Sequence, residues 1–227
     1  MNRKAIALAM AVMLAVSAAG CSSTGESTAS ASGSAGASGS GQSSVSSSAA
    51  SSASSSSSAS SSAPLALTEA FAEGPVLLST AGQSADVEMV NVLLGKMGVT
   101  ATVDNTADGS DLGDYKTLVL AIGGSSKGLG AAGIDADAEI ARVESLSKAA
   151  DEAGLSIIAV HIGGAARRGD LGDKFIAPGF EYADYAVVVA SGDEDGMMAS
   201  LAAEAGIPLA YADSMADVVE PLQAAFK

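Results

Sequence analysis

Short apolar runs alternate with longer amphipathic segments between residues 65 and 227, and this alternation predicts the fold. The runs expected to form strands lie at residues 76–78, 101–103, 117–122, 157–162, 185–190 and 207–210. Those in the middle are continuous rather than alternating, which is typical of strands covered by helices on both faces. The pattern predicts a single α/β domain with a doubly wound, mostly parallel sheet.

Four segments between and after these runs have the spacing of amphipathic helices. They are expected at about residues 87–97, 135–153 and 195–205, and from Ser214 towards the C-terminus. The first three stop at Gly98, Gly154 and Gly206, because glycine adopts the left-handed conformation that often ends a helix. Asp217 is the expected capping partner of Ser214 in the last helix.

A different pattern precedes the domain. Arg3 and Lys4 are followed by an apolar stretch from Ala5 to Val16 and by small residues before Cys21, the single cysteine. The stretch is shorter than the roughly 20 residues that span a bilayer, and the layout is that of a bacterial lipoprotein signal peptide. We expect residues 1–20 to be removed and Cys21 to carry a lipid on the extracytoplasmic face of the cell membrane. The alternative is a plainly secreted protein, since the small residues 18–20 also suit an ordinary signal peptidase.

Residues 21–64 consist mainly of Ser, Ala and Gly, and Glu26 is their single charged residue. Such a segment buries too little apolar surface to offset the entropy of ordering it. We therefore expect a disordered tether between the lipidated cysteine and the α/β domain at residues 65–227.

The strong net negative charge of the chain limits the classes of molecule that it can bind. The chain has 11 Lys and Arg against 26 Asp and Glu, a net charge of −15, and nearly all of these residues lie after residue 64. A field of this sign repels nucleic acid and anionic membrane surfaces. The expected partners are the membrane, through the lipid on Cys21, and a small anionic ligand, with no nucleic acid; no protein partner can be assigned.

The order of the first elements is similar to that of flavodoxin-like domains and of the amidotransferase-like family. In both, a strand, a helix and a strand are followed by a short polar piece, here residues 108–116, and then by the strongest strand. The resemblance implies that the first and third strands are neighbours at a topological switch point. Ligands bind there, outside the carboxyl ends of the strands.

Polar loops follow four of the predicted strands, at residues 79–86, 123–133, 161–173 and 191–196, and should meet at one edge of the sheet. Glycines let backbone amides approach a ligand, Lys127 adds a point charge, and an arginine fork suits carboxylate or phosphate. The alternative is that the glycines only make tight turns and that the arginines pair with Asp170 and Asp173. The expected ligand-binding residues are Gln83, Ser84, Gly124, Ser125, Ser126, Lys127, Gly128, Arg167 and Arg168.

His161, the single histidine, ends the fourth run, where amidotransferase-like relatives carry a nucleophilic cysteine. The domain has no cysteine, so that thiol chemistry is excluded. His161 is a candidate general base of a hydrolase or transferase using the same pocket, or a ligand donor; the alternative is a buried, hydrogen-bonded structural residue. Whether the protein is an enzyme stays open.

No cofactor or metal is expected. The G-x-G-x-x-G match at residues 128–133 is not directly on a strand end, and the calcium-loop start at Asp104 has Tyr115 in place of the final Glu. The acidic run at residues 193–195 is expected to be a turn and a helix start rather than a metal cluster.

Three strings resemble a bacterial family of domains of unknown function found in exported proteins and lipoproteins. They are GQSAD at residues 82–86, IGGSSKGLGAAGID at 122–135, and HIGG followed by RRGDL at 161–171. The resemblance covers nearly all of residues 75–226. It implies a Rossmann-like domain in an extracytoplasmic setting and brings no established activity. A cell-envelope module whose loops bind another protein is therefore a third hypothesis.

Overall fold

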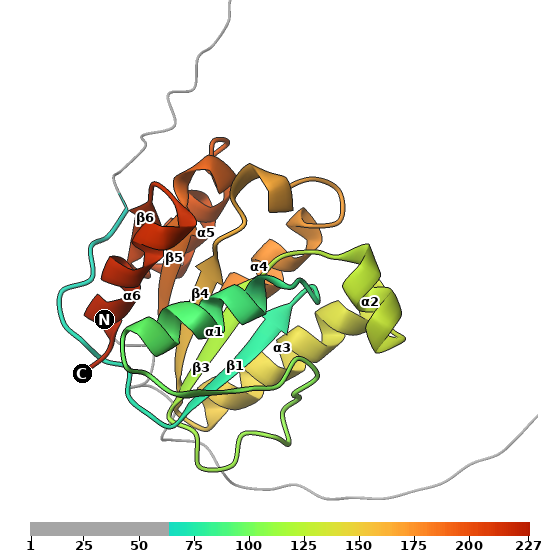
Figure 1. The fold of residues 1–227 in the computed structure, drawn as a ribbon, viewed down its shortest axis with the longest axis horizontal. Helices are drawn as coiled ribbons and strands as arrows, with labels where there is room; N and C mark the ends of the chain where they lie inside the picture. Colours follow the sequence, from blue (N-terminus) through green and yellow to red (C-terminus); the bar gives the residue numbers. More distant parts are fainter. Residues whose placement is uncertain (1–63) are drawn as a thin grey trace, which may run out of the picture. The chain divides into compact units, whose positions relative to one another are not determined.

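Six strands form one sheet in which every neighbouring pair is parallel, in the order β2-β1-β3-β4-β5-β6 (Figure 1). The computed structural model describes residues 64–227; the expected signal peptide, Cys21 and the tether up to residue 63 lie outside the described residues. The predicted α/β class is confirmed, and so is the pairing of the first strand with the third. The strands are β1 (Val76–Ala81), β2 (Ala101–Val103), β3 (Thr117–Ile122), β4 (Ser156–His161), β5 (Tyr185–Val189) and β6 (Leu209–Ala212).

Burial on both faces explains why the middle runs are continuous. All residues of β1, β3 and β5 are buried. Successive side chains enter opposite cores: Leu77 and Leu120 lie in one core, and Leu78 and Val119 lie in the other. Because both faces of the sheet are shielded from solvent, apolar or small residues are favoured at every position of these strands rather than at alternate ones. The edge strands β2 and β6 are partly exposed, so their runs are short and mixed.

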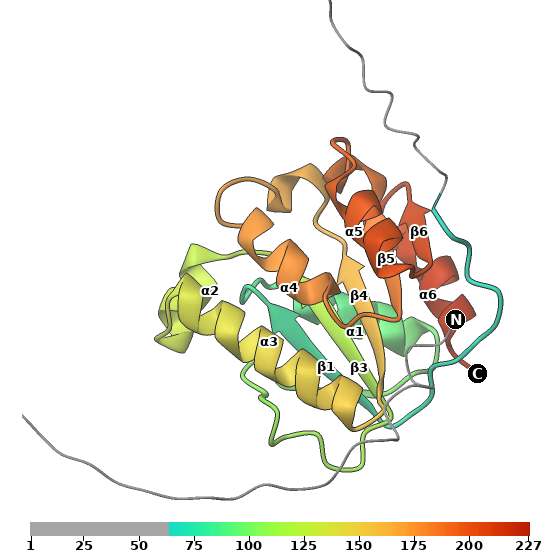
Figure 2. The ribbon, with the colours of Figure 1, turned by 180° about the vertical axis from the view of Figure 1, so that it is seen from behind.

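Helices cover both faces of the sheet. Helices α1 (Asp86–Lys96) and α6 (Val219–Ala225) lie on the face that is in front in Figure 1. Helices α3 (Ala136–Glu152), α4 (Ile176–Phe180) and α5 (Met197–Ala205) cover the opposite face, in front in Figure 2. Within residues 64–227, none of the helices is both long and apolar enough to cross a membrane.

The ends of several helices are set by capping residues and glycines that can be recognised in the sequence. The carboxylate of Asp135 accepts the N–H of Ala138 at 2.8 Å and caps the start of α3. Gly206, with φ of 68°, ends α5 in the left-handed conformation. The hydroxyl of Ser214 donates to the carboxylate of Asp217 at 2.6 Å, where the 3₁₀ turn η5 (Met215–Val218) leads into α6.

The glycine-rich segment 123–133 differs from the expected loop, because it contains helix α2 (Ser126–Ala132). Ser125 caps this helix by accepting the N–H of Gly128 at 3.0 Å, and Leu129 anchors it in the core below. One cap and one buried leucine thus offset the poor helix propensity of the glycines. The short helix α4 and the 3₁₀ turns η2 (Gly164–Arg167), η3 (Asp173–Phe175) and η4 (Ala190–Gly192) were likewise not expected.

Candidate functional site

Because all strands of the sheet are parallel, their carboxyl ends lie at the same edge, called here the carboxyl edge. It is formed by residues 82–86, 104–108, 123–128, 161–175 and 190–196, together with the parts of α3 that contact them. The predicted ligand-binding residues and His161 all lie at this edge. Their roles depend on what each side chain contacts.

The loops after β1 and β3 contact each other directly at the switch point. Gln83 and Gly124 form an antiparallel bridge, and the N–H of Ser125 donates to the carbonyl of Gly82 at 2.9 Å. A Cβ placed on Gly82 would lie 2.5 Å from the carbonyl oxygen of Gly123, so only a glycine permits this approach. Backbone groups of these two loops are therefore bonded to each other.

Two further glycines serve the same close packing. A Cβ on Gly128 would clash with the carbonyl oxygen of Gln83 and lie 2.9 Å from its carbonyl carbon. A Cβ on Gly124 would lie 2.9 Å from both N and Cα of Gly172. The glycine motif therefore holds three loops against one another.

Of the polar residues at the start of α2, one caps the helix and two point into solvent. The Ser125 hydroxyl is used as the helix cap. Ser126 and Lys127 are exposed, and neither side chain has a hydrogen bond or ion pair within residues 64–227. Their donors are available to a ligand.

Gln83 is held in an unusual conformation by its side chain. Its φ is +59°, the only positive value of a non-glycine residue among residues 64–227. Its amide Nε2 donates to the carbonyl of Asn105 at 2.8 Å and to Oε2 of Glu139 at 3.1 Å. These bonds tie the loop after β1 to the loop after β2 and to α3. Gln83 is therefore engaged with protein rather than presented to solvent.

Glu139 and Arg142 form a buried ion pair that sequence reasoning missed. The two residues are bonded at 2.8 Å, and the Glu139 side chain is fully buried. Glu139 also accepts the N–H of Gly82 at 2.9 Å, while Arg142 donates to the carbonyls of Thr80 and Ala107. A signal was present: Glu139 lies four residues before Val143 on the apolar face of the predicted helix. A charge at such a position must have a partner.

Arg167 is paired with Asp86, which precedes it by 81 residues. Nε donates to Oδ2 at 2.8 Å and Nη2 donates to Oδ1 at 3.0 Å. Gly163 makes room for the pair, because a Cβ there would lie 2.8 Å from Cβ of Arg167 and 2.9 Å from the Asp86 carboxylate. Asp86 raises the pKa of Arg167 by accepting these bonds. Nη1 has no partner within residues 64–227, so the end of the guanidinium stays free.

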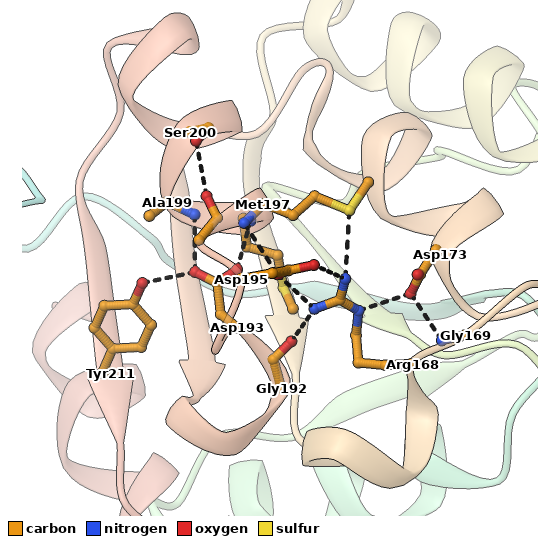
Figure 3. A network of polar contacts seen from close by, with 12 residues as sticks. Arg168, Gly169, Asp173, Gly192, Asp193, Asp195, Met197, Ala199, Ser200 and Tyr211 are labelled. Atoms are coloured by element: carbon orange, nitrogen blue, oxygen red, sulfur yellow. Dashed lines mark hydrogen bonds and ion pairs between the residues drawn. The ribbon is translucent and has the colours of Figure 1, made fainter. Parts of the chain in front are cut away.

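Arg168 is saturated by protein acceptors (Figure 3). Its guanidinium donates to Asp173 at 2.6 Å, to the carbonyl of Gly192 at 2.5 Å, and to both carboxylate oxygens of Asp195 at 3.0 and 2.8 Å. The bonds from Arg168 lower the pKa of Asp195 to about 2. The expected alternative pairing with Asp173 is present for Arg168, whereas Arg167 pairs with Asp86 instead of Asp170.

Asp193, next to this network, has a structural role. Its carboxylate accepts the N–H groups of Met198 at 2.6 Å and Ala199 at 2.9 Å, at the start of α5. The Tyr211 hydroxyl donates to the same carboxylate at 2.6 Å (Figure 3). Burial and then Asp193 raise the pKa of Tyr211. The acidic run thus provides a helix cap and a partner for Arg168, in line with the expected turn and helix start.

His161 is fully buried, and neither of its ring nitrogens has a hydrogen-bond partner among the described residues. The ring lies against Gly192, where a Cβ would come within 2.7 Å of Cε1 and 2.8 Å of Nδ1. Burial and then Arg168 lower its pKa, outweighing Asp86 and Asp193, which raise it. His161 is therefore a neutral imidazole. The burial expected for a structural residue is present, without a side-chain hydrogen bond to a described residue.

Comparison with known proteins gives a family. The model of a domain of unknown function, DUF6305, matches residues 73–226. A search of curated proteins finds no match.

Two solved structures match parts of the chain. A putative GMP synthase component from Thermoplasma acidophilum is 21% identical over 48% of this chain and 46% of its own, with a TM-score of 0.30. A truncated 3-deoxy-D-arabino-heptulosonate 7-phosphate synthase from Thermotoga maritima is 13% identical over 66% of this chain and 45% of its own, with a TM-score of 0.28. The chain spans less than half the length of either protein, and likenesses this weak support no statement about function.

The packing of Gly128 predicts a contrast between two glycines of the same helix. We expect Gly128→Ala to lower the free energy of unfolding by about 1–3 kcal/mol, because the added methyl group meets the Gln83 backbone. Gly130→Ala is the matched control: nothing lies within 4 Å of its Cβ position, so alanine should stabilise α2 by about 0.5–1 kcal/mol. Urea unfolding of both variants measures the difference. Equal effects would contradict the close packing of α2 on the β1 loop.

The buried imidazole predicts a pH dependence of stability. As pH falls below about 6.5, the unfolded chain protonates His161 while the folded protein, with its lowered pKa, does not. The unfolded state then binds more protons, so the free energy of unfolding falls by at most about 1.4 kcal/mol per pH unit. Between pH 6.5 and the lowered pKa, the free energy of unfolding of the wild type should therefore fall more steeply with decreasing pH than that of His161→Gln. Parallel pH profiles of the two proteins in urea unfolding would refute the assignment.

Proposed function

The chain belongs to the DUF6305 family, a domain of unknown function, and from that premise we propose that its α/β domain binds a small anionic molecule at the carboxyl edge. In this proposal a lipid on Cys21 holds the domain at the extracytoplasmic face of the membrane. The observation that carries the ligand part is the free end of the Arg167 guanidinium.

Asp86 orients Arg167 for a ligand without using all of its donors. The carboxylate takes Nε and one hydrogen of Nη2, which leaves Nη1 and the outer edge of the fork free. A planar fork of this kind binds carboxylate or phosphate through two parallel bonds. The Arg167 side chain is 31% exposed, whereas Asp86 is 9% exposed. A ligand can therefore reach the arginine while Asp86 stays in place.

Lys127 and Ser126 supply the second group of donors. Both lie exposed at the first turn of α2, in the segment that packs on the β1 loop, and neither is bonded to a described residue. The ammonium of Lys127 lies at the end of a flexible side chain and can adjust to ligands of different shape, whereas the guanidinium of Arg167 is held in one orientation. In a chain of net charge −15, such free cations at the ligand-binding edge of an α/β sheet favour an anion over a cation.

Binding is favoured over catalysis by the state of His161. A general base must come within hydrogen-bond reach of the proton it removes, and the imidazole is fully buried. The hydrolase or transferase hypothesis therefore needs a second conformation of this edge. Arg168 does not contribute to the proposed site, because all its bonds go to protein groups.

Lys127→Ala tests the anion site with little risk to the fold, since the side chain has no partner among the described residues. We expect inorganic phosphate, sulfate, short dicarboxylates or sugar phosphates to raise the Tm of the full-length protein. The shift should shrink at least by about half in Lys127→Ala, since one charge-assisted contact is worth about 1.5–3 kcal/mol. Thermal unfolding with and without each anion measures the effect.

Lys96→Ala is the matched control, an exposed lysine in the last turn of α1. It should leave the anion-induced shift unchanged. If none of these anions stabilises the wild type, or if Lys127→Ala and Lys96→Ala behave alike, the anion site is wrong.

The membrane anchor is tested by Cys21→Ala, because only the cysteine thiol can carry the lipid. In a bacterial host we expect the wild type in the membrane fraction and Cys21→Ala released from it. Ser22→Ala, the adjacent residue, should stay with the membrane. Recovery of both variants in the same fraction would contradict the anchor, and fractionation followed by immunoblotting makes the comparison.

A further inference from the structure

A buried polar side chain without partners is rare, and His161 has two such atoms. Leaving one buried donor or acceptor unpaired costs about 1–3 kcal/mol. Neither Nδ1 nor Nε2 is bonded to a described residue, so we expect an apolar residue of similar size to be more stabilising at this position. Such a group calls for an explanation beyond packing.

The segment that covers His161 is attached mainly by polar contacts. It comprises residues 163–172, includes η2, and is called here the lid. Four of its residues are exposed, and its buried ones, Gly164 and Gly172, are glycines. The partly buried Leu171 is its main apolar contact with the core. Few buried apolar contacts are the mark of a segment that opens at low free energy. Gly164 and Gly169, with φ of +55° and +103°, give the lid two points at which the backbone can turn.

Arg168 fastens the lid to the opposite wall. From within the lid it donates to the carbonyl of Gly192 in η4 and to Asp195 beyond it (Figure 3). Gly192 is the residue against which the His161 ring lies, and the space beside it is closed by Gly164 of the lid. The arginine therefore clasps the two loops over the imidazole. Asp195 is 59% exposed, so this part of the clasp faces solvent, where it is weakest.

We propose that residues 163–172 form a lid that opens locally and uncovers His161 as a hydrogen-bonding group for a ligand. Opening releases the Arg168 clasp together with the Arg167–Asp86 pair, which lies in the same segment. This deepens the proposed function by adding a gated group at the same edge, but it does not require that Lys127 or Arg167 bind an anion. The charged groups around the ring are Arg168 on the lid, Asp86 on α1 and Asp193 after η4. Burial and Arg168 lower the pKa of His161 while the lid is closed. Above the ordinary histidine value of about 6.5, the uncovered ring is a neutral imidazole, which can accept a proton or a hydrogen bond.

Chemical modification of the single histidine tests the lid. Diethyl pyrocarbonate transfers its ethoxycarbonyl group to a neutral imidazole nitrogen, with loss of the ring proton and release of ethanol and carbon dioxide. The rate at His161 in the full-length protein, followed by mass spectrometry of its peptide, reports how often the ring is uncovered. Asp195→Asn weakens the clasp while Arg168 stays. We expect it to raise the rate only about fivefold, because the ion pair that it weakens is largely exposed to solvent.

Glu152→Gln is the matched control, since it removes an acidic partner from the exposed Lys148–Glu152 pair of α3, away from the lid. It should leave the rate within about twofold. Low urea separates local from global opening: lid opening exposes little surface, so the wild-type rate should barely change, whereas global unfolding is steeply urea-dependent. Equal rates in Asp195→Asn and Glu152→Gln would overturn the lid. A wild-type rate that rises with urea as steeply as unfolding does would overturn it as well.

Discussion

Parallel pairing of all six strands is the constraint on which the rest of this structure depends. Parallel strands need a crossover between them, so helices cover both faces and nearly every position of the interior strands is buried. The same pairing sends the loop after each strand to one edge. Residues that are far apart in the sequence, such as Asp86 and Arg167, are thereby brought into contact. The charged side chains that bond to one another are concentrated at that edge, because the strands themselves carry mainly apolar residues and a few Ser and Thr.

Ion pairs hold this edge together. The described residues include three arginines, and each one binds a carboxylate. Arg167 pairs with Asp86 and Arg168 with Asp173 and Asp195, which join different segments, whereas Arg142 pairs with Glu139 on the same helix. The excess of acidic residues supplies these partners. Glycines at positions 82, 124 and 128 then let the loops come close enough for the pairs to form. Acidity here serves the internal structure of the edge as well as solubility.

The sequence predicted the elements well and the contacts poorly, for one physical reason. Apolar runs, helix spacing and end glycines such as Gly206 are local, and they gave the strands, the main helices and the pairing of β1 with β3. The partner of Arg167 depends on how two distant loops meet, which no local pattern encodes. Helix α2 was not predicted because glycine has a low helix propensity. The N-cap at Ser125 and the burial of Leu129 stabilise the helix despite its glycines. Glu139 was within reach of sequence reasoning, since a carboxylate on an apolar helix face implies a buried partner.

The Asp86–Arg167 pair also limits how any ligand can bind. Displacing Arg167 would leave a nearly buried Asp86 carboxylate without its partner, which is unfavourable. An anion that competes with Asp86 would have to recover that loss before it gained any affinity. One that approaches the free Nη1 end keeps the pair intact and meets a guanidinium that is already oriented. The geometry therefore selects ligands that add to the network, and it makes Asp86 a positioning residue whose removal should loosen the arginine rather than free it.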